Sequence, residues 1–242
     1  MRKILVVSGF DPCGAGVLAD IKTAKSLNTF ALAVLTCLTA QNSCRVYDIK
    51  PVDTDLFEEK LKAVLEDAKI DAVKIGLISD VKIAKVLIEY LKDIKVPKVL
   101  DPILNATTGK RIGDLEAYRI LLKYVDVITP NLSEAREICE MNGNATDIAL
   151  EIYRNYGCSV VVTGGEMRGT DVLCYNGEIY EIEAEIFNVE IHGTGCVYST
   201  ALACYLAKGL NLIDSCRFAR LFIIDNVKKA VKIGRCLPVM NP

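Results

Sequence analysis

Short apolar runs rich in β-branched residues alternate with amphipathic helical patterns along most of this chain, and this alternation restricts its fold more than any other feature. Strands that are apolar on both faces and separated by helices are typical of a parallel sheet covered by helices on both sides. Strands are expected at residues 3–8, 33–39, 72–75, 98–101, 125–129 and 159–163. Helices are expected at residues 17–27, 55–68, 81–91, 115–123, 132–141 and 147–155. The sequence therefore predicts an α/β fold with a mostly parallel central sheet.

The pattern changes after residue 170. Two β-rich stretches, 172–175 and 179–184, flank Asn176-Gly177. This pair is typical of a type I′ turn, so the segment predicts a β-hairpin. Two helices, 197–208 and 212–232, are expected to follow. Because no repeat, low-complexity tract or linker divides the 242 residues, we expect a single domain over residues 1–242.

The segment HGTGC, residues 192–196, stands where an extended stretch meets the helix expected at 197–208. Its two glycines allow a tight turn, so successive N–H groups can converge at the helix N-terminus, where the helix dipole also favours an anion. A cysteine in this first turn is expected to have a stabilised thiolate and hence a lowered pKa. These properties suit phosphoryl transfer, although a glycine loop capped by Thr194 explains the same residues.

Charge and cysteine content exclude several classes of protein. The net charge is −2, with acidic and basic residues interspersed, so we expect no nucleic-acid partner. The ten cysteines include no CxxC pair and the chain has one histidine, so neither zinc nor disulfides are expected. No leader-like segment or apolar run of about 18 residues occurs, which predicts a cytoplasmic location and no membrane partner. With a single histidine, histidine-centred catalysis is not expected.

The first turn of the chain reads GFDPCGAG, residues 9–16. Its glycines let the backbone approach a ligand closely, but the spacing fits neither the dinucleotide fingerprint nor a P-loop. Taken alone, the segment is better explained as a plain turn. In open α/β sheets, however, ligands collect beyond the carboxyl ends of the strands, which is where this turn is expected to lie.

A second polar cluster follows the strand expected at 125–129. Asn131 and Glu134 are three residues apart in the first turn of the next helix, so an amide and a carboxylate share one face. This spacing is that of a capping box. The same oxygen atoms also suit a hydrated Mg²⁺ ion held on nucleotide phosphates.

Together these segments resemble the ribokinase-like superfamily and, within it, the hydroxymethylpyrimidine/phosphomethylpyrimidine kinases of thiamine biosynthesis. The segments that carry the resemblance, in family order, are GFDPCGAGVLAD (9–20), TAQN (39–42), KIG (74–76), DP (101–102), ITPNLSE (128–134), TGG (163–165) and HGTGC (192–196). The resemblance implies a three-layer αβα ribokinase-like fold. It also implies that ATP and Mg²⁺ serve to phosphorylate 4-amino-5-hydroxymethyl-2-methylpyrimidine and then its monophosphate.

The resemblance also assigns roles to individual residues. Gln41, the only glutamine, is expected to hydrogen-bond the aminopyrimidine edge. The rest of the substrate pocket is expected to comprise Gly9, Ala15, Asp20, Leu77 and Ile103. The anion hole is expected to comprise Gly193, Thr194, Gly195 and Cys196, with Cys196 as the base. The nucleotide is expected to contact Asn131, Thr163, Gly164 and Gly165, and the metal to be held by Glu134 and Asp101.

Three positions depart from the pattern of the family. The first loop commonly reads DPSGGAG there, whereas here it is one residue shorter and carries Cys13. Thr163 stands where a lysine is common, which is expected to weaken the hold on the second, more anionic substrate. Leu77 replaces a frequent methionine, a swap that conserves volume.

Two other functions remain open at this stage. Pyridoxal kinases share the GTGC-type motif, although Gln41 and the KIG segment favour the pyrimidine. A regulator that binds the pyrimidine without chemistry would suit the altered first loop. A nicotinamide dehydrogenase is disfavoured because its phosphate-binding fingerprint is absent. Relatives without a large lid often dimerise, so a homodimer is a further expectation of the resemblance.

Overall fold

The computed structural model describes residues 1–164, 169–183 and 190–242. The strands of these residues form one nine-stranded sheet at the centre of the protein. The strands are β1 (Arg2–Phe10), β2 (Thr29–Gln41), β3 (Val46–Pro51), β4 (Ala72–Ile75), β5 (Lys98–Leu100), β6 (Val127–Ile128), β7 (Ser159–Val162), β8 (Asp171–Tyr175) and β9 (Glu178–Ile182). Their order in the sheet is β3-β2-β1-β4-β5-β6-β7-β8-β9. The pairs from β2 to β7 are parallel, and the pairs that involve β3, β8 and β9 are antiparallel.

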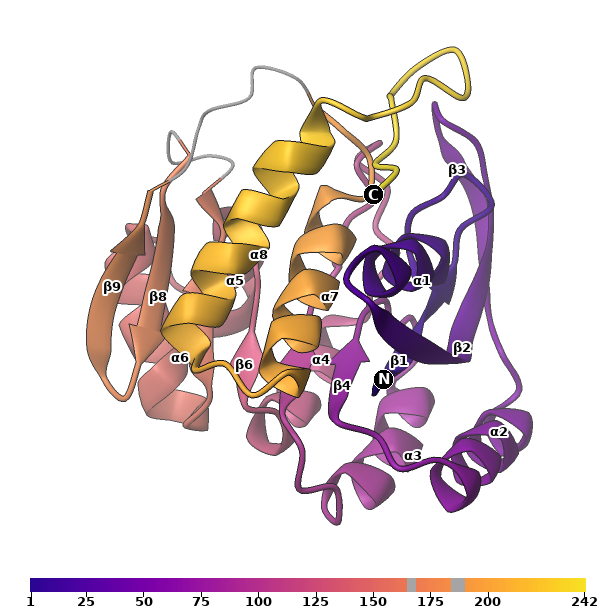
Figure 1. The fold of residues 1–242 in the computed structure, drawn as a ribbon, viewed down its shortest axis with the longest axis horizontal. Coiled ribbons are helices and arrows are strands. Elements are labelled where there is room, and N and C mark those ends of the chain that lie inside the picture. The colour runs from indigo at the N-terminus through magenta and orange to yellow at the C-terminus, as the bar shows by residue number, and fades with distance from the viewer. Residues whose placement is uncertain (165–168, 184–189) are drawn as a thin grey trace.

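Helices cover both faces of this sheet (Figure 1). One layer holds α1 (Val17–Ser26), α7 (Thr194–Ala207) and α8 (Leu212–Val227). The other layer holds α2 (Thr54–Asp67), α3 (Val81–Leu91), α4 (Leu115–Leu121) with the short 3₁₀ turn η1 (Leu122–Tyr124), α5 (Leu132–Cys139) and α6 (Ala145–Tyr156). Two apolar clusters, one under each layer, form the core, so the predicted three-layer αβα fold is confirmed.

The order of the strands determines where a ligand can bind. The chain passes from β1 to β2 on one side and then crosses to β4 on the other, so the direction of winding reverses between β1 and β4. At such a reversal the loops after adjacent strands diverge and leave a crevice at the carboxyl edge. The first glycine loop follows β1 at this point.

The hydrophobic pattern located most elements correctly. The hairpin β8–β9 has the predicted type I′ turn, because Asn176 and Gly177 have φ of 52° and 80°. Helix α8 ends at Val227, five residues before the predicted end, and α7 begins at Thr194, three residues before the predicted start. The strand β3 was missed, because its exposed, charged and proline-containing sequence is that of an edge strand rather than a buried one.

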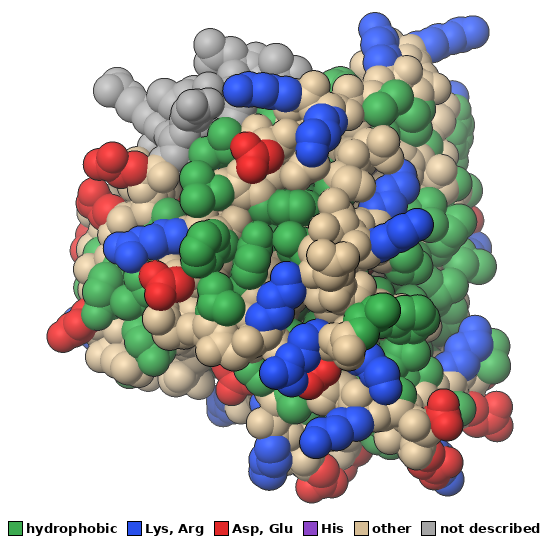
Figure 2. Space-filling view, viewed as in Figure 1, with side chains coloured by type: hydrophobic (Ala, Val, Ile, Leu, Met, Phe, Trp, Pro, Cys, Tyr) green, Lys and Arg blue, Asp and Glu red, His purple; other side chains and the backbone are tan. Residues whose placement is uncertain are grey.

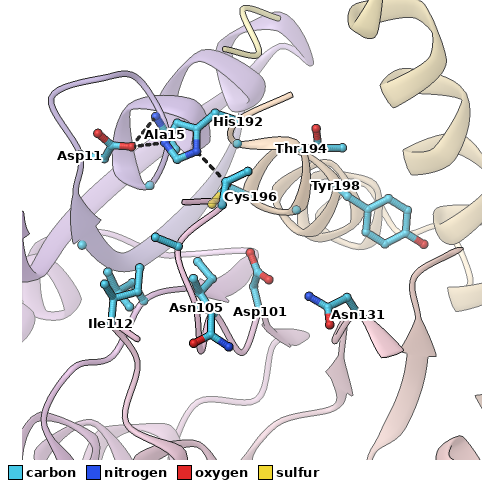
Figure 3. A pocket seen from close by; sticks show the side chains of 18 of the residues that line it. Asp11, Ala15, Asp101, Asn105, Ile112, Asn131, His192, Thr194, Cys196 and Tyr198 are labelled. Atoms are coloured by element: carbon cyan, nitrogen blue, oxygen red, sulfur yellow. Dashed lines mark hydrogen bonds and ion pairs between the residues drawn. The ribbon is translucent and has the colours of Figure 1, made fainter. Parts of the chain in front are cut away.

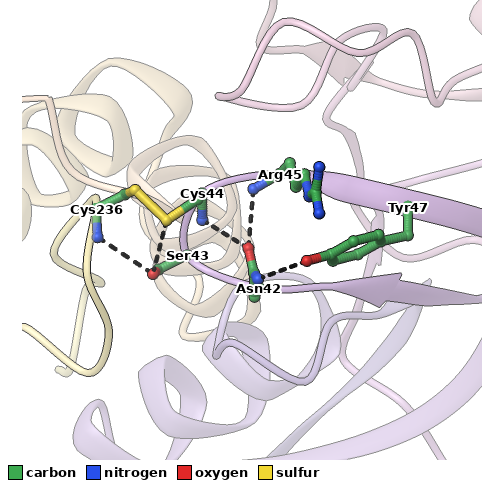
Figure 4. The surroundings of a disulfide bond; sticks show 6 residues. All are labelled: Asn42, Ser43, Cys44, Arg45, Tyr47 and Cys236. Atoms are coloured by element: carbon green, nitrogen blue, oxygen red, sulfur yellow. Dashed lines mark hydrogen bonds between the residues drawn. A yellow bond between two sulfur atoms is a disulfide. The ribbon is translucent and has the colours of Figure 1, made fainter.

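The expectation that no disulfide forms is wrong. Cys44, in the turn between β2 and β3, is bonded to Cys236 near the C-terminus, and their Cα atoms lie 5.1 Å apart (Figure 4). Ser43 supports the junction, since its Oγ accepts the Cys236 N–H at 3.4 Å. The two cysteines are 192 positions apart, so no local spacing could reveal the pair. The other eight cysteines are free.

The surface over α7 and α8 carries basic, acidic and hydrophobic side chains interspersed (Figure 2). This arrangement agrees with the mixed charge pattern of the sequence. Among the described residues, no helix combines the length and the apolar character needed to cross a bilayer.

Candidate active site

A cavity of about 310 Å³ lies at the carboxyl edge of the sheet, where the loops after β1, β4, β5, β6 and β7 meet the start of α7. Its lining is more apolar than polar and comes from segments far apart in the chain. Figure 3 shows His192 beside Asp11 near the start of α7, with Asp101, Asn105 and Asn131 on the other side of the cavity. The volume is at the lower end for ligand pockets (about 300–1,000 Å³), so it suits one small ring and its substituents.

The HGTGC segment, whose last four residues are predicted to form an anion hole, contains the N-terminus of α7. Gly193 caps the helix with φ of 86°, a left-handed conformation that glycine adopts without strain. The first intrahelical hydrogen bond runs from Val197 N to Gly193 O. The N–H groups of residues 194–196 precede this bond and therefore have no acceptor within the helix. Thr194 Oγ1 donates to Ile191 O at 2.8 Å, which holds the turn closed. All four residues from Gly193 to Cys196 line the cavity.

The prediction of a lowered pKa for Cys196 is wrong for the free protein. Burial raises the pKa of this thiol well above its ordinary value, and the nearby Lys74 ammonium opposes the rise only in part. The carboxylates of Asp101 and Asp20 add to the rise. The sequence places Cys196 correctly in the first helical turn, but it does not reveal the buried charges beneath it.

The expected substrate contact through Asp20 is also wrong. Asp20 is fully buried on α1 and lies outside the cavity lining. Lys74 Nζ donates to both of its carboxylate oxygens, at 2.9 and 3.1 Å, and Thr200 Oγ1 donates at 2.6 Å. Lys74 Nζ also lies 3.8 Å from Asp101 Oδ2. One buried ammonium group is therefore ion-paired with two carboxylates near the N-terminus of α7. Asp20 therefore links β4, α1 and α7.

Asn131 and Glu134 form the predicted capping box and also face the cavity. Glu134 Oε2 accepts the Asn131 N–H at 3.0 Å, and Asn131 Oδ1 accepts the Glu134 N–H at 2.9 Å. Glu134 Oε1 accepts the Leu104 N–H at 3.2 Å. Burial raises the pKa of Glu134 to about 8, although the two backbone hydrogen bonds oppose the rise. The capping and ligand-facing interpretations of this pair are thus compatible.

The oxygen atoms at this end of the cavity fit a hydrated Mg²⁺ ion better than a protein-bound one. Both oxygens of Glu134 already accept backbone N–H groups, and Asp101 Oδ2 accepts from Ser199 Oγ at 3.0 Å. Within residues 1–164, 169–183 and 190–242, no three histidine, cysteine or acidic side chains gather into a metal site. Mg²⁺ typically keeps several waters and takes one or two carboxylates together with substrate phosphates. Asp101, Glu134 and the amide of Asn131 fit that role.

The remaining residues expected around the substrate do lie together. The cavity lining includes Gln41, Gly9, Ala15, Leu77 and Ile103. At Gly9 the absence of a side chain is required, because a Cβ there would lie 2.7 Å from Cys37 Sγ and 2.9 Å from Leu77 Cδ2.

The residues expected to contact the nucleotide are only partly brought together. Thr163 lines the cavity and its N–H bonds Pro130 O at 2.8 Å. Gly164 does not line it, and its N–H donates to Asp171 Oδ1 at 2.7 Å. Gly165 lies outside the described residues. Asp171 is also ion-paired with Arg220, a cavity-lining residue of α8.

Sequence reasoning missed several residues of the cavity wall. Arg220 lies in a helix without a local motif, so nothing near it in the sequence indicated a site. Thr107 and Asn105 belong to the loop between β5 and α4, which carries no glycine pattern of the expected kind. His192 was recognised as part of HGTGC but was not given a role, although a lone histidine beside an anion hole was a usable signal.

A helix N-terminus that follows a glycine turn and opens onto a small, largely apolar cavity, with acidic side chains at one end, suits a phosphotransferase. Comparisons with known proteins agree. A family model described as phosphomethylpyrimidine kinase matches residues 11–240. The hydroxymethylpyrimidine/phosphomethylpyrimidine kinase of Aquifex aeolicus (strain VF5) is 36% identical over 251 aligned positions, which cover 98% of this chain and 98% of the relative. The chain belongs to the phosphomethylpyrimidine kinase family.

Solved structures give the same fold. The pyridoxal kinase from Staphylococcus aureus in complex with AMP-PCP has a TM-score of 0.89 at 26% identity and covers 100% of this chain and 93% of that one. The phosphomethylpyrimidine kinase from Clostridium difficile 630 has a TM-score of 0.81 at 26% identity, over 93% of this chain and 99% of that one. The protein is therefore a ribokinase-like phosphotransferase that uses ATP, and its second substrate is a small molecule of the pyrimidine or pyridoxal type.

Proposed function

We propose that this protein transfers the γ-phosphoryl group of ATP to the hydroxymethyl group of 4-amino-5-hydroxymethyl-2-methylpyrimidine, and then phosphorylates the resulting monophosphate. The observation that supports this proposal most is that Gln41 lines the same small cavity as the anion hole at residues 193–196. A ring recognised by Gln41 would therefore have its hydroxymethyl group within the cavity that the anion hole serves.

The lining suits a flat heterocycle with a polar edge. Leu77, Ile103 and Ala15 offer apolar contacts for the ring faces. The amide of Gln41 can both donate to and accept from an aminopyrimidine, whose exocyclic amine and ring nitrogen present this pair of functions. The cavity is thus polar at one edge and apolar over the ring, as discrimination between heterocycles requires.

The anion hole would act on the phosphoryl group as it transfers. The N–H groups of residues 194–196 and the positive end of the α7 dipole favour the charge that spreads over its oxygens. Mg²⁺, held mainly on the ATP phosphates and oriented by Asp101, Glu134 and Asn131, would neutralise further charge. Arg220, which enters the cavity from α8, is suited to the phosphates on the nucleotide side.

Cys196 is proposed as the base that accepts the proton of the substrate hydroxyl. Because burial raises its pKa, the thiol is protonated in the free protein at neutral pH. A base must be deprotonated to accept a proton, so only the thiolate form of Cys196 can act. The Lys74 ammonium nearby stabilises the charge of this thiolate. It follows that kcat should rise with pH through the neutral range.

Replacement of Cys196 tests this role. Cys196→Ala is expected to lower kcat about 10²-fold, while Cys196→Asp, which supplies a carboxylate base at the same place, is expected to recover part of the loss and to flatten the pH dependence. Circular dichroism of both variants serves as the folding control. A wild-type rate in Cys196→Ala would remove Cys196 from the chemistry.

The substrate itself is tested by assay of the purified protein with Mg-ATP and the pyrimidine alcohol, with the phosphates added to the product counted by mass spectrometry. Addition of two phosphates would support both steps, whereas addition of one would limit the proposal to the first. Thr163, in place of a common lysine, leads us to expect the slower rate at the second step.

Pyridoxal phosphorylation is the second candidate, because solved pyridoxal kinases share this fold with TM-scores near 0.88 over the whole chain. The ratio of kcat/KM for the pyrimidine alcohol to kcat/KM for pyridoxal decides between them. A ratio below one would overturn the pyrimidine assignment. Binding of either alcohol without ATP consumption would instead identify a regulator that lacks chemistry.

Association into a homodimer is part of the same proposal. Phe30 and Leu38 on β2 and Ile21 on α1 are hydrophobic side chains that are 53%, 49% and 41% exposed. A second copy covering them would remove this apolar area from water. Sedimentation velocity at micromolar concentration tests the expectation, and a purely monomeric profile would contradict it.

A further inference from the structure

His192 lies where three walls of the cavity meet. Its imidazole Nε2 is 2.6 Å from Asp11 Oδ2 in the first glycine loop, and its Nδ1 is 2.9 Å from Thr107 Oγ1 in the loop between β5 and α4. Its own backbone leads directly into the anion hole at Gly193. Asp11, Thr107 and His192 all line the cavity, and Figure 3 shows Asp11 and His192 facing one another.

The bond to Asp11 fixes the arrangement of protons on the ring. Although burial raises the pKa of Asp11, hydrogen bonds from His192, from Gln41 and from the Cys13 N–H outweigh it, so this pKa lies below its ordinary value. An ionised carboxylate only accepts, so His192 Nε2 carries a proton. In the neutral ring, Nδ1 then accepts from the Thr107 hydroxyl.

Asp11 connects this bond to the substrate wall. Its Oδ1 accepts the Cys13 N–H at 2.7 Å and its Oδ2 accepts the Ala15 N–H at 3.3 Å, so this carboxylate holds the shortened first loop closed. Gln41 lines the same cavity, and its amide is among the groups that lower the pKa of Asp11.

Thr107 connects the bond to the opposite wall. It belongs to a small turn in which Ala106 N donates to Lys110 O at 2.8 Å and Gly109 N donates to Ala106 O at 2.7 Å. Ala106 and Ile112 from the same loop line the cavity. The hydroxyl of Thr107 is thus a point at which this loop is held toward the first glycine loop.

The ring itself is held by a rigid backbone. His192 N donates to Pro238 O at 2.9 Å, and His192 O accepts from Met240 N at 3.0 Å. Both backbone groups are therefore used by the C-terminal segment, which is secured in turn by the disulfide at Cys236. The imidazole therefore projects from a fixed point and is hydrogen-bonded to both loops.

We propose that His192 is a positioning residue that determines affinity for the alcohol substrate. By bridging Asp11 and Thr107 it holds the first glycine loop and the β5–α4 loop together across the cavity. It does not itself touch the transferred phosphoryl group. This inference relies on the proposed function only in that a small heteroaromatic alcohol occupies the cavity.

The test separates alcohol binding from chemistry. In His192→Ala we expect Kd and KM for the alcohol to rise about 10- to 100-fold, because one neutral hydrogen bond and one to a carboxylate are lost. We expect kcat to change less than about threefold and KM for ATP to stay unchanged, since uniform substrate binding alone is lost. His192→Gln, whose Nε2 can still donate to Asp11, should recover part of the affinity.

Thr107 supplies the second arm and its control. Thr107→Val removes the hydroxyl with little change of shape and should raise Kd for the alcohol about 3- to 10-fold, whereas Thr108→Val, at an exposed neighbour outside the cavity lining, should not change it. If the two residues act through one another, the double variant His192→Ala/Thr107→Val will bind no more weakly than His192→Ala.

Three results would overturn the proposal: unchanged Kd in both single variants, strictly additive effects in the double variant, or a loss in kcat with KM unaltered. Thr107 lies on a loop, so the variant Thr107→Val is expected to fold. Its Kd for the alcohol therefore tests the proposal even if His192→Ala does not fold. Kd is measured by calorimetry for whichever of the pyrimidine alcohol and pyridoxal the wild type binds more tightly. A preference for pyridoxal would therefore refute the proposed function and leave this test intact.

Discussion

The disulfide between Cys44 and Cys236 is expected to stabilise the fold by an amount that follows from the length of the loop it closes. It closes a loop across 192 residues, nearly the whole chain. A crosslink of this span removes entropy from the unfolded chain, worth about 5 kcal/mol in the chain-entropy model and about 2–4 kcal/mol in typical measurements. For a chain of 242 residues, a loss of 1 kcal/mol in the free energy of unfolding lowers Tm by about 2 °C. Cys44→Ser is therefore expected to lower Tm by about 4–10 °C.

The assay compares thermal unfolding of wild type and Cys44→Ser, each with and without a reductant. Reductant should lower the Tm of the wild type to that of the variant and leave the variant unchanged. Cys139→Ser, which removes a free thiol, serves as the matched control and should still respond to reductant. Thiol titration in denaturant should count eight thiols before reduction and ten after it.

One outcome would refute the reasoning. If thiol titration counts eight but the Tm of the oxidised wild type equals that of Cys44→Ser, the crosslink does not restrict the unfolded chain as supposed. The C-terminal segment would then be held to the β2–β3 turn by its hydrogen bonds to Ser43 rather than by the covalent link.

Three further perturbations have defined outcomes. Lys74→Met leaves the buried carboxylate of Asp20 without its cation and should lower the free energy of unfolding by about 3–5 kcal/mol in urea titrations; a loss under 1 kcal/mol would contradict this. Burial raises the pKa of Glu134 from 4.5 to about 8, so the folded protein retains a proton that the unfolded chain loses, and stability should fall as pH rises between these values. Glu134→Gln should remove that part of the slope, and an unchanged slope would exclude Glu134 as its source. Gly164→Ala would place a Cβ 2.1 Å from Thr170 O and should lower Tm by about 2–6 °C in calorimetry; an unaltered Tm would mean that this turn relaxes freely.

The elements that could be predicted from the sequence are those whose signals are local. A strand such as β4 is a short apolar run, and the turn at Asn176-Gly177 depends on the conformations of two adjacent residues. The position of HGTGC at the start of α7 was likewise predictable, because its glycines and the first helical turn are neighbours in the chain. The parallel arrangement then brings the strand ends together at one edge.

What could not be predicted depends on contacts between distant residues. Asp20 has the sequence context of a residue near the first loop, but its partner Lys74 is 54 positions away and draws its carboxylate into the core. The pKa of Cys196 follows from burial and from two carboxylates that no local pattern places beneath it. The bond between Cys44 and Cys236 joins opposite ends of the chain. In each case tertiary burial, rather than local propensity, decides the chemistry.

The path of the last residues has a practical consequence for handling the protein. Met1 is 91% exposed and precedes β1 at the amino edge of the sheet, whereas Val239 pairs with His192 beside the cavity (Figure 1). A purification tag added before Met1 would project into solvent far from the cavity. A tag or fusion partner added after Pro242 would begin shortly after Val239, close to the cavity-lining His192, so preparations tagged at the two ends should not be treated as kinetically equivalent.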